Sequence, residues 1–406
     1  MSDVFILGAG FSKAISVEMP TTNGVSPFRA PMPDGWGGAS ISAPGMDPGW
    51  YPGKSLSEEI LTASFTPPIP DPIRKMIGED LEKALAFLAQ DQPWMTKSQN
   101  ERHKAIFLSL TNVIRTVIWE RSKSPSVPGK NRPHAWLDWL IGYWHENRCA
   151  VITLNYDTLV ERTASAIYGP KRPAITTGSL YPICLTPAVL PRKELMPVER
   201  IPGAEPKESF KLFKLHGSIN WFYSGRSDFF GEELFYVPHE GGLDRPFGIA
   251  AGTDSDNEDL ERLSGKFSLI IPPTLDKSGY FQHEALRAMW FQAGEALRQA
   301  TRVICMGYSL PDSDFTMAQF LKTCAPQNRV QFEIVDLATR DNRESKVDHF
   351  ARVTGKDSYE FRQSYSGETC IPEFIRDELI RDREDKGRVG RDVNLASLGE
   401  SEKGER

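Results

Sequence analysis

Three side chains that could do chemistry stand in two short motifs: Asn155 and Asp157 in Asn-Tyr-Asp, and His216 in Leu-His-Gly-Ser. Histidine titrates near pH ~6.5, so His216 could accept a proton from a hydroxyl group or from water at cellular pH. Asn155 and Asp157 supply hydrogen-bonding groups of two kinds, an uncharged amide and a carboxylate. Each motif follows an apolar run that is typical of a β-strand. We therefore expect all three residues at strand ends, where open α/β sheets bind their ligands.

Each of these residues also has an ordinary structural explanation. Asn155 and Asp157 could cap the helix expected after them, and His216 could be a histidine satisfied within a turn. For any single residue the structural explanation is favoured. The structural explanation is weaker for the set as a whole, because one chain has five polar or glycine-rich strand ends. They are Gly8-Ala9-Gly10-Phe11-Ser12, Thr153 to Asp157, Leu215 to Ser218, Gly307-Tyr308-Ser309-Leu310 and Asp336.

The first strand end lies almost at the start of the chain, where Val4 to Leu7 runs into Gly8-Ala9-Gly10. Glycines between a strand and a helix let backbone N–H groups approach a phosphate, although a tight turn without a ligand explains them equally well. The third glycine of the dinucleotide-binding fingerprint is replaced by Lys13. The acidic residue that should end a second strand about twenty residues later is missing, because a Pro/Gly-rich stretch stands there. An ordinary dehydrogenase is therefore not expected.

Apolar runs alternate with amphipathic segments along the chain, which predicts an α/β fold with a mostly parallel sheet. Strands are expected over 4–7, 149–155, 210–218, 267–274, 302–309 and 329–336, and helices over 158–168, 281–301 and 314–325. Apolar residues recur at helical spacing between about 60 and 148, which predicts an inserted helical lobe within one domain, 1–375. The loop 20–57 could act as a lid or be an ordinary surface segment. Residues 376–406 are highly charged, which favours a solvated helix end and a disordered tail.

The composition restricts the class of protein. The chain has 406 residues, 40% of them hydrophobic, and a net charge of −6, so we expect a globular protein without direct nucleic-acid or membrane contact. Its five cysteines and seven histidines form no metal-ligand spacing, so we expect no metal. No signal peptide or membrane-spanning run is recognised, which predicts a cytoplasmic protein.

The motifs Gly-Ala-Gly-Phe-Ser, Ile-Thr-Leu-Asn-Tyr-Asp, Lys-Leu-His-Gly-Ser and Gly-Tyr-Ser-Leu-Pro-Asp, in this order, resemble the sirtuin-like NAD-consuming domain of bacterial immune effectors. The resemblance covers roughly residues 1–375 and implies a Rossmann-like, NAD-binding core. It implies that Asn155 and His216 are catalytic and that Asp157 is the acidic residue of the Asn-x-Asp motif. The cofactor-binding residues that it implies are Gly8, Ala9, Gly10, Phe11 and Ser12 at the pyrophosphate, Gly307, Tyr308, Ser309 and Asp336 near the adenosine half, and Thr153.

Two departures from the deacylating sirtuins bear on the reaction. This sequence lacks their two Cys-x-x-Cys pairs, and Leu154 stands where they commonly have glutamine. Water then becomes the acceptor, which predicts an NAD+ glycohydrolase that releases nicotinamide and ADP-ribose, with NAD as its substrate and no metal. The alternatives are a non-catalytic NAD- or ADP-ribose-binding sensor or structural subunit of a defence complex and, fitting less well, a protein deacylase.

Depletion of NAD would be toxic and would need control. The resemblance implies an antiphage effector that assembles with a HerA-type ATPase or a short Argonaute. Large apolar side chains in the helical segments also predict a homo-oligomer with contacts from residues 70–150, unless these helices bury their apolar faces against one another. The side chains are Ile114, Val117, Ile118, Trp136, Trp139 and Trp144.

Overall fold

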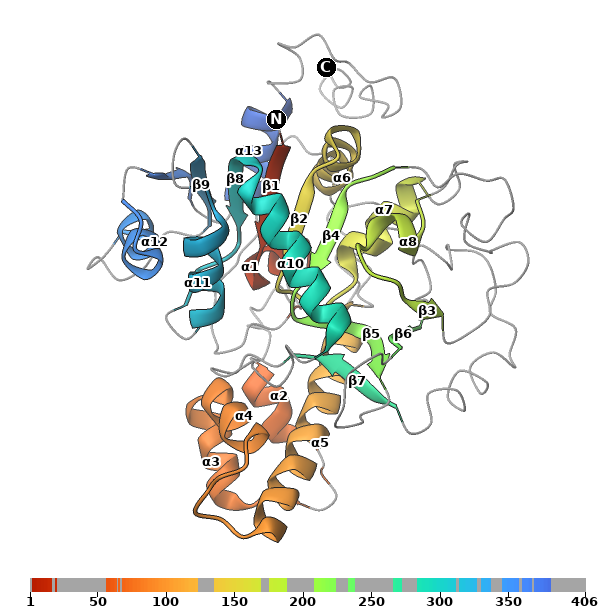
Figure 1. Ribbon diagram of the computed structural model, residues 1–406, viewed down its shortest axis with the longest axis vertical. Helices are drawn as coiled ribbons and strands as arrows, with labels where there is room; N and C mark the ends of the chain where they lie inside the picture. The colour runs from red at the N-terminus through yellow and green to blue at the C-terminus, as the bar shows by residue number, and fades with distance from the viewer. Residues whose placement is uncertain are drawn as a thin grey trace, which may run out of the picture.

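Figure 1 shows the chain as a computed structural model. The structure describes residues 2–16, 19, 56–63, 65, 68–122, 135–168, 175–187, 208–223, 233–237, 266–271, 283–311, 314–326, 330–336, 345–357, 360–366 and 369–380. The loop expected over 20–57 lies outside these residues except at 56 and 57, and so does the charged tail from residue 381 onward.

A six-stranded parallel sheet forms the centre of the fold. Its spatial order is β10-β9-β8-β1-β2-β4. The strands are β1 (Ser2–Leu7), β2 (Ala150–Thr153), β4 (Lys211–Lys214), β8 (Ala300–Met306), β9 (Gln331–Val335) and β10 (Phe361–Tyr365). Numbered along the chain within this sheet, the order reads 3-2-1-4-5-6 from the β4 edge, which is that of the Rossmann dinucleotide-binding fold. The expected α/β fold with a Rossmann-like parallel sheet is confirmed.

The apolar runs of the sequence explain why the central strands lie inside. Val4 to Leu7 of β1 are fully buried, and β1 pairs in parallel with β2 on one side and β8 on the other. Parallel strands covered on both faces are apolar at every position instead of alternating. Leu7 is level with both Thr153 and Met306, so the residues that follow these three strands meet at one edge.

Helices that alternate with the strands cover this sheet. They are α1 (Ala9–Ile15), α6 (Ala135–Asn147), α7 (Leu159–Tyr168), α10 (Glu284–Arg298), α11 (Phe315–Cys324), α12 (Lys346–Thr354) and α13 (Cys370–Phe374), which continues into a π-helical turn (Ile375–Ile380). Helix α10 crosses β4, β2 and β8 (Figure 1). Helix α6 packs on β1 through Trp144, whose ring lies 5.4 Å from that of Phe5.

Four further helices form a separate lobe, residues 56–122, beyond the carboxyl edge of the sheet (Figure 1). They are α2 (Leu56–Thr62), α3 (Asp71–Glu79), α4 (Leu81–Ala89) and α5 (Lys97–Ser122). They contact one another through buried side chains such as Ile60, Ile77, Leu85 and Leu110. The lobe was expected over about 60–148, but α6, within that range, covers the sheet.

The apolar residues that suggested an oligomer are covered by the chain itself. Ile114, Ile118, Trp136, Trp139 and Trp144 are all at most 5% exposed, and Val117 is half-buried against the core. These side chains therefore need no second chain to cover them. The homo-oligomer itself stays a prediction.

A second, smaller sheet corrects two of the expected strands. Its order is β3-β6-β5-β7, with strands β3 (Thr186–Pro187), β5 (Gly217–Tyr223), β6 (Phe235–Tyr236) and β7 (Phe267–Ile270), and α8 (Thr177–Leu180) precedes it. The strand expected over 210–218 is in fact two strands, because the chain turns at Gly217, which has a φ of 77°. Of the strand expected over 267–274, residues 272–274 lie outside the described part of the chain, and the described strand, β7, pairs antiparallel with β5 in the smaller sheet.

Candidate functional site

The two glycine-rich loops meet at the point where the sheet reverses its order. The chain leaves β1 toward β2 and leaves β8 toward β9, so the loops after β1 and β8 flank the switch point at which such sheets bind ligands. The Gly10 N–H group donates to the Gly307 carbonyl oxygen at 2.9 Å, and Gly8 N–H donates to the Met306 carbonyl at 3.1 Å. Ala9 at the tip of the first loop is exposed.

The close contact between the two loops by itself requires glycine at positions 8 and 307. A Cβ on Gly8 would lie 2.5 Å from the Gly307 oxygen, and one on Gly307 would lie 2.2 Å from the Phe11 nitrogen. Gly307 also has a φ of 60°, the left-handed region that favours glycine. The N–H groups of Gly10 and Phe11, expected at a pyrophosphate, have acceptors within the protein, because Phe11 donates to the Gly8 carbonyl oxygen.

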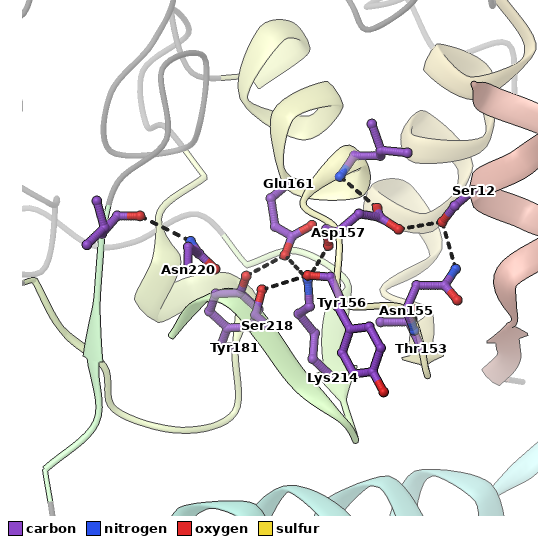
Figure 2. A network of polar contacts seen from close by, with 12 residues as sticks. Ser12, Thr153, Asn155, Tyr156, Asp157, Glu161, Tyr181, Lys214, Ser218 and Asn220 are labelled. Carbon is purple, nitrogen blue, oxygen red and sulfur yellow. Dashed lines mark hydrogen bonds and ion pairs between the residues drawn. The ribbon is translucent and has the colours of Figure 1, made fainter. Parts of the chain in front are cut away.

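Three of the expected site residues form one hydrogen-bonded cluster (Figure 2). Ser12, on α1, donates through its hydroxyl group to Asp157 Oδ2 at 2.5 Å. Asn155, in the loop after β2, donates through Nδ2 to Ser12 Oγ and to the Gly8 carbonyl oxygen, both at 2.8 Å. We call these three side chains the Ser12 cluster. It joins the loops after β1 and β2 at the carboxyl edge of the sheet.

The cluster fixes the orientation of the Asn155 amide. Both acceptors lie on its NH2 side, so the carboxamide oxygen points away from Ser12, as Figure 2 shows. The main-chain N–H of Asn155 donates to Thr153 Oγ1 at 3.1 Å. Thr153, expected to bind the cofactor, thus shapes the loop that carries Asn155. None of these contacts with the described residues is to an N–H group of α7, so Asn155 does not cap that helix.

Asp157 both caps a helix and belongs to the site, the two roles that the sequence left open. Its Oδ1 accepts a 3.0 Å bond from the main-chain N–H of Leu159, the first residue of α7, so it does cap the start of that helix. Its Oδ2 belongs to the Ser12 cluster. Burial raises the pKa of the Asp157 carboxyl group, whereas the charge of Lys214 and the hydrogen bond from Ser12 act in the opposite direction.

His216 lies at the same edge, between β4 and β5. It is 6% exposed, and its main-chain carbonyl accepts from Ile271 N–H at 2.9 Å. Its ring centroid lies 6.2 Å from that of Tyr156, the residue between Asn155 and Asp157. The Tyr156 hydroxyl donates to the carbonyl oxygen of the same Ile271 at 2.5 Å. The structure therefore links His216 to the Asn-Tyr-Asp loop through Tyr156 and Ile271.

The residues expected near the adenosine half have partners within the protein. Tyr308 is buried and donates through its hydroxyl group to Asp314 Oδ2 at 2.9 Å. Asp336, also buried, accepts from Lys346 Nζ at 2.6 Å. Ser309 is exposed. Among the described residues, neither Tyr308, after β8, nor Asp336, after β9, has a hydrogen bond to the Ser12 cluster.

Sequence reasoning missed two charged residues next to the cluster, Lys214 and Glu161. Lys214, the last residue of β4, and Glu161, on α7, form an ion pair of 2.8 Å with side chains only 1% and 7% exposed. The one available signal was a lysine inside the apolar run Phe-Lys-Leu-Phe-Lys-Leu, at a position where a sheet interior has to satisfy its charge. Its partner, 53 residues away, leaves no trace in the local sequence.

A comparison with models of known protein families finds no match, and none of the curated proteins matches the chain. Among the described residues, no group of three or more histidine, cysteine, aspartate or glutamate side chains is placed to hold a metal ion. Of the helices that the structure describes, none is both long and apolar enough to cross a membrane.

Proposed function

We propose that this protein is an NAD+ glycohydrolase that cleaves NAD+ to nicotinamide and ADP-ribose. The observation that carries the proposal is the Ser12 cluster, in which an amide with a fixed orientation lies beside the switch point of a sheet with Rossmann strand order. Dinucleotides bind at that position in sheets of this order. The resemblance to sirtuin-like domains names NAD as the dinucleotide.

The chemistry of the bond fits the groups at this edge. The nicotinamide leaving group is already cationic, so the reaction needs little acid assistance. It needs an acceptor that holds a ribose hydroxyl group or the attacking water, and a group that takes a proton. The Asn155 carboxamide oxygen, directed away from Ser12 and Gly8, serves as the acceptor. His216 takes the proton, because imidazole titrates near cellular pH.

Asp157 contributes through its charge and through Ser12. A buried carboxylate near the reacting ribose stabilises the positive charge that develops in the transition state. Its hydrogen bond from the Ser12 hydroxyl leaves the Ser12 oxygen free to accept from Asn155, which holds the amide in place. Asp157 is therefore a positioning residue for Asn155 as well as an electrostatic one.

Binding of the adenosine half is compatible with the partners of Asp336. A carboxylate has about four acceptor sites, so Asp336 can accept from a ribose hydroxyl group while it keeps Lys346. Tyr308 keeps its hydroxyl bond to Asp314 and contributes its main chain near Gly307.

The experiment is to incubate the purified chain with NAD+ and to measure free nicotinamide by chromatography. Asn155→Ala and His216→Ala should each lower kcat by about 100-fold or more while circular dichroism and melting temperature stay close to the parent. Asn147→Ala is the matched control, because Asn147, the last residue of α6, donates to the Tyr143 carbonyl oxygen of the same helix. A normally folded Asn155→Ala/His216→Ala variant that still cleaves NAD+ would overturn the proposal.

The proposal extends to control by assembly, as the resemblance implies. We propose that a partner protein, a HerA-type ATPase or a short Argonaute, switches the activity on and that the complex acts in antiphage defence. Nicotinamide release should then rise when the partner is added to the chain. Binding of NAD or ADP-ribose with no release under either condition would favour the sensor instead.

A further inference from the structure

A second group of polar contacts lies beside the Ser12 cluster, on the other side of Asp157, and centres on Lys214 (Figure 2). Lys214 Nζ donates to the Asp157 carbonyl oxygen, to Glu161 Oε1 at 2.8 Å and, over a longer 3.5 Å, to the Tyr156 carbonyl oxygen. An ammonium group has three N–H donors, so these three acceptors use all of them. Two of the three belong to the main chain of the Asn-Tyr-Asp motif.

A buried charge at this position is not explained by stability alone. Burying an ammonium group is costly unless it is paired, and a buried ion pair can often be replaced by apolar side chains of similar size without loss of stability. Glu161 supplies the counter-charge and also accepts from the Tyr181 hydroxyl at 2.6 Å. An apolar side chain in place of Lys214 would remove the contacts to the two carbonyl oxygens.

Those two carbonyl oxygens belong to a segment that lacks regular structure. Residues 154–158 lie between β2 and α7, outside strand and helix. The Tyr156 carbonyl also accepts from Ile219 N–H at 3.0 Å and from the Ser218 hydroxyl at 3.3 Å. Lys214 precedes His216 by two residues. The same ammonium group therefore ties the segment that carries Asn155 to the segment that carries His216.

We propose that Lys214 is a positioning residue, whose ammonium group holds the main chain of Tyr156 and Asp157 and thereby sets the position of the Asn155 side chain relative to His216. The inference rests on the proposed NAD+ cleavage. It predicts that Lys214 acts on the chemical step and leaves substrate affinity largely unchanged, because it touches neither the expected pyrophosphate loop nor Asp336.

The variants are chosen so that loss of folding does not decide the result. Lys214→Met/Glu161→Gln removes both members of the ion pair together, so Glu161 is not left as a buried carboxylate without its lysine. Glu161→Gln alone keeps the Lys214 bonds to the two carbonyl oxygens. Lys211→Met is the matched control on the same strand, since Lys211 Nζ donates to the Ser179 carbonyl oxygen, outside the site.

The first readout is hydrogen–deuterium exchange of the free protein in the peptide that spans residues 154–160. We expect faster exchange there in the double variant, little change in Glu161→Gln and none in Lys211→Met. Unchanged exchange in a folded double variant would overturn the inference, whatever the activity, because the segment would then be held by other contacts.

The second readout is NAD+ cleavage, measured as kcat and KM over a range of pH. The double variant should lose about 10- to 100-fold in kcat with KM within about threefold, the signature of a misplaced reacting group. Burial has the largest effect on the pKa of Asp157 and raises it; the charge of Lys214 lowers this pKa by more than the charge of Glu161 raises it, so the acidic limb of the pH profile should move to higher pH in the double variant. Faster exchange with an unchanged kcat would overturn the positioning role. A parent chain that releases no nicotinamide, either alone or with the partner protein, would overturn the proposed function itself, and the exchange result would still show whether Lys214 holds residues 154–158.

Discussion

The Ser12 hydroxyl group donates a 2.5 Å hydrogen bond to Asp157, although 145 residues separate the two in sequence. The same oxygen accepts from Asn155 Nδ2 at 2.8 Å. A hydroxyl group has one proton, so its donation to the carboxylate leaves its lone pairs facing Asn155. The chain of donors thus runs from Asn155 through Ser12 to Asp157, and the amide of Asn155 can satisfy Gly8 and Ser12 only with its NH2 group toward them.

Ser12→Ala should therefore disturb the reaction without unfolding the protein. We expect kcat to fall about 10- to 100-fold, the range for loss of one hydrogen bond to a charged group. The bond from Ser12 also lowers the pKa of Asp157, against the larger effect of burial. Its removal raises that pKa, so the acidic limb of the kcat/KM profile should move to higher pH. Steady-state rates from about pH 5 to 9 measure both effects.

Ser16→Ala is the matched control for this variant. Ser16 follows α1, is buried like Ser12, and its hydroxyl group has no hydrogen-bond partner among the residues that the structure describes. Its replacement should leave both kcat and the pH profile unchanged. Equal losses in the two variants would show that any disturbance of α1 lowers activity and that the Ser12 bond has no special role.

Asp157→Asn should separate stability from activity. Burial raises the folded pKa of Asp157 above the unfolded value of about 3.9. The contribution of Asp157 to stability is then fully present below pH ~3.9 and is lost as the pH rises through the folded pKa. The loss is about 1.4 kcal/mol for each unit by which the folded pKa exceeds the unfolded pKa. The free energy of unfolding of Asp157→Asn, relative to the parent, should increase from pH 4 to pH 8 in urea titrations, while kcat falls.

The local parts of this site could be predicted from the sequence. The sequence predicts a strand before Gly8 to Gly10 and another before the Asn-Tyr-Asp motif. Because parallel strands end together, it also predicts Ser12, Asn155 and Asp157 at one edge of the sheet. The sequence could not show that Gly10 donates to Gly307, since that contact depends on which strands are neighbours.

Other features depend on long-range packing and left no local signal. The run 210–218 looks like one strand, yet the close approach of Gly217 to Leu269 turns the chain into a second sheet. Helical periodicity in residues 135–147 identified an apolar face. It did not show that this face packs against the sheet around Phe5. Lys214 and Glu161 were missed for the same reason, because neither residue predicts its partner.

Gly307→Ala should be strongly destabilising. A methyl group there would meet the Phe11 nitrogen at 2.2 Å, and the φ of 60° is unfavourable for alanine. We expect a loss of about 3 kcal/mol or more in the free energy of unfolding. Gly78→Ala is the control: its Cβ would meet only Leu61 Cδ1, at an ordinary 3.5 Å, so it should gain up to about 1 kcal/mol in α3. Wild-type stability of Gly307→Ala would contradict the close contact between the two loops.

Trp144→Ala tests whether the apolar face of α6 belongs to the fold or to an interface between chains. The Trp144 ring is fully buried and lies 5.4 Å from Phe5, 6.2 Å from Phe11 and 5.6 Å from Phe210. Its truncation should cost about 3–5 kcal/mol of unfolding free energy in urea. Trp94, 73% exposed in the lobe, is the control and should change stability by no more than about 0.5 kcal/mol. Light scattering on both variants completes the test: if Trp144→Ala released stable, folded monomers from a larger species, the side chain would lie at an interface and the packing described for α6 would be wrong.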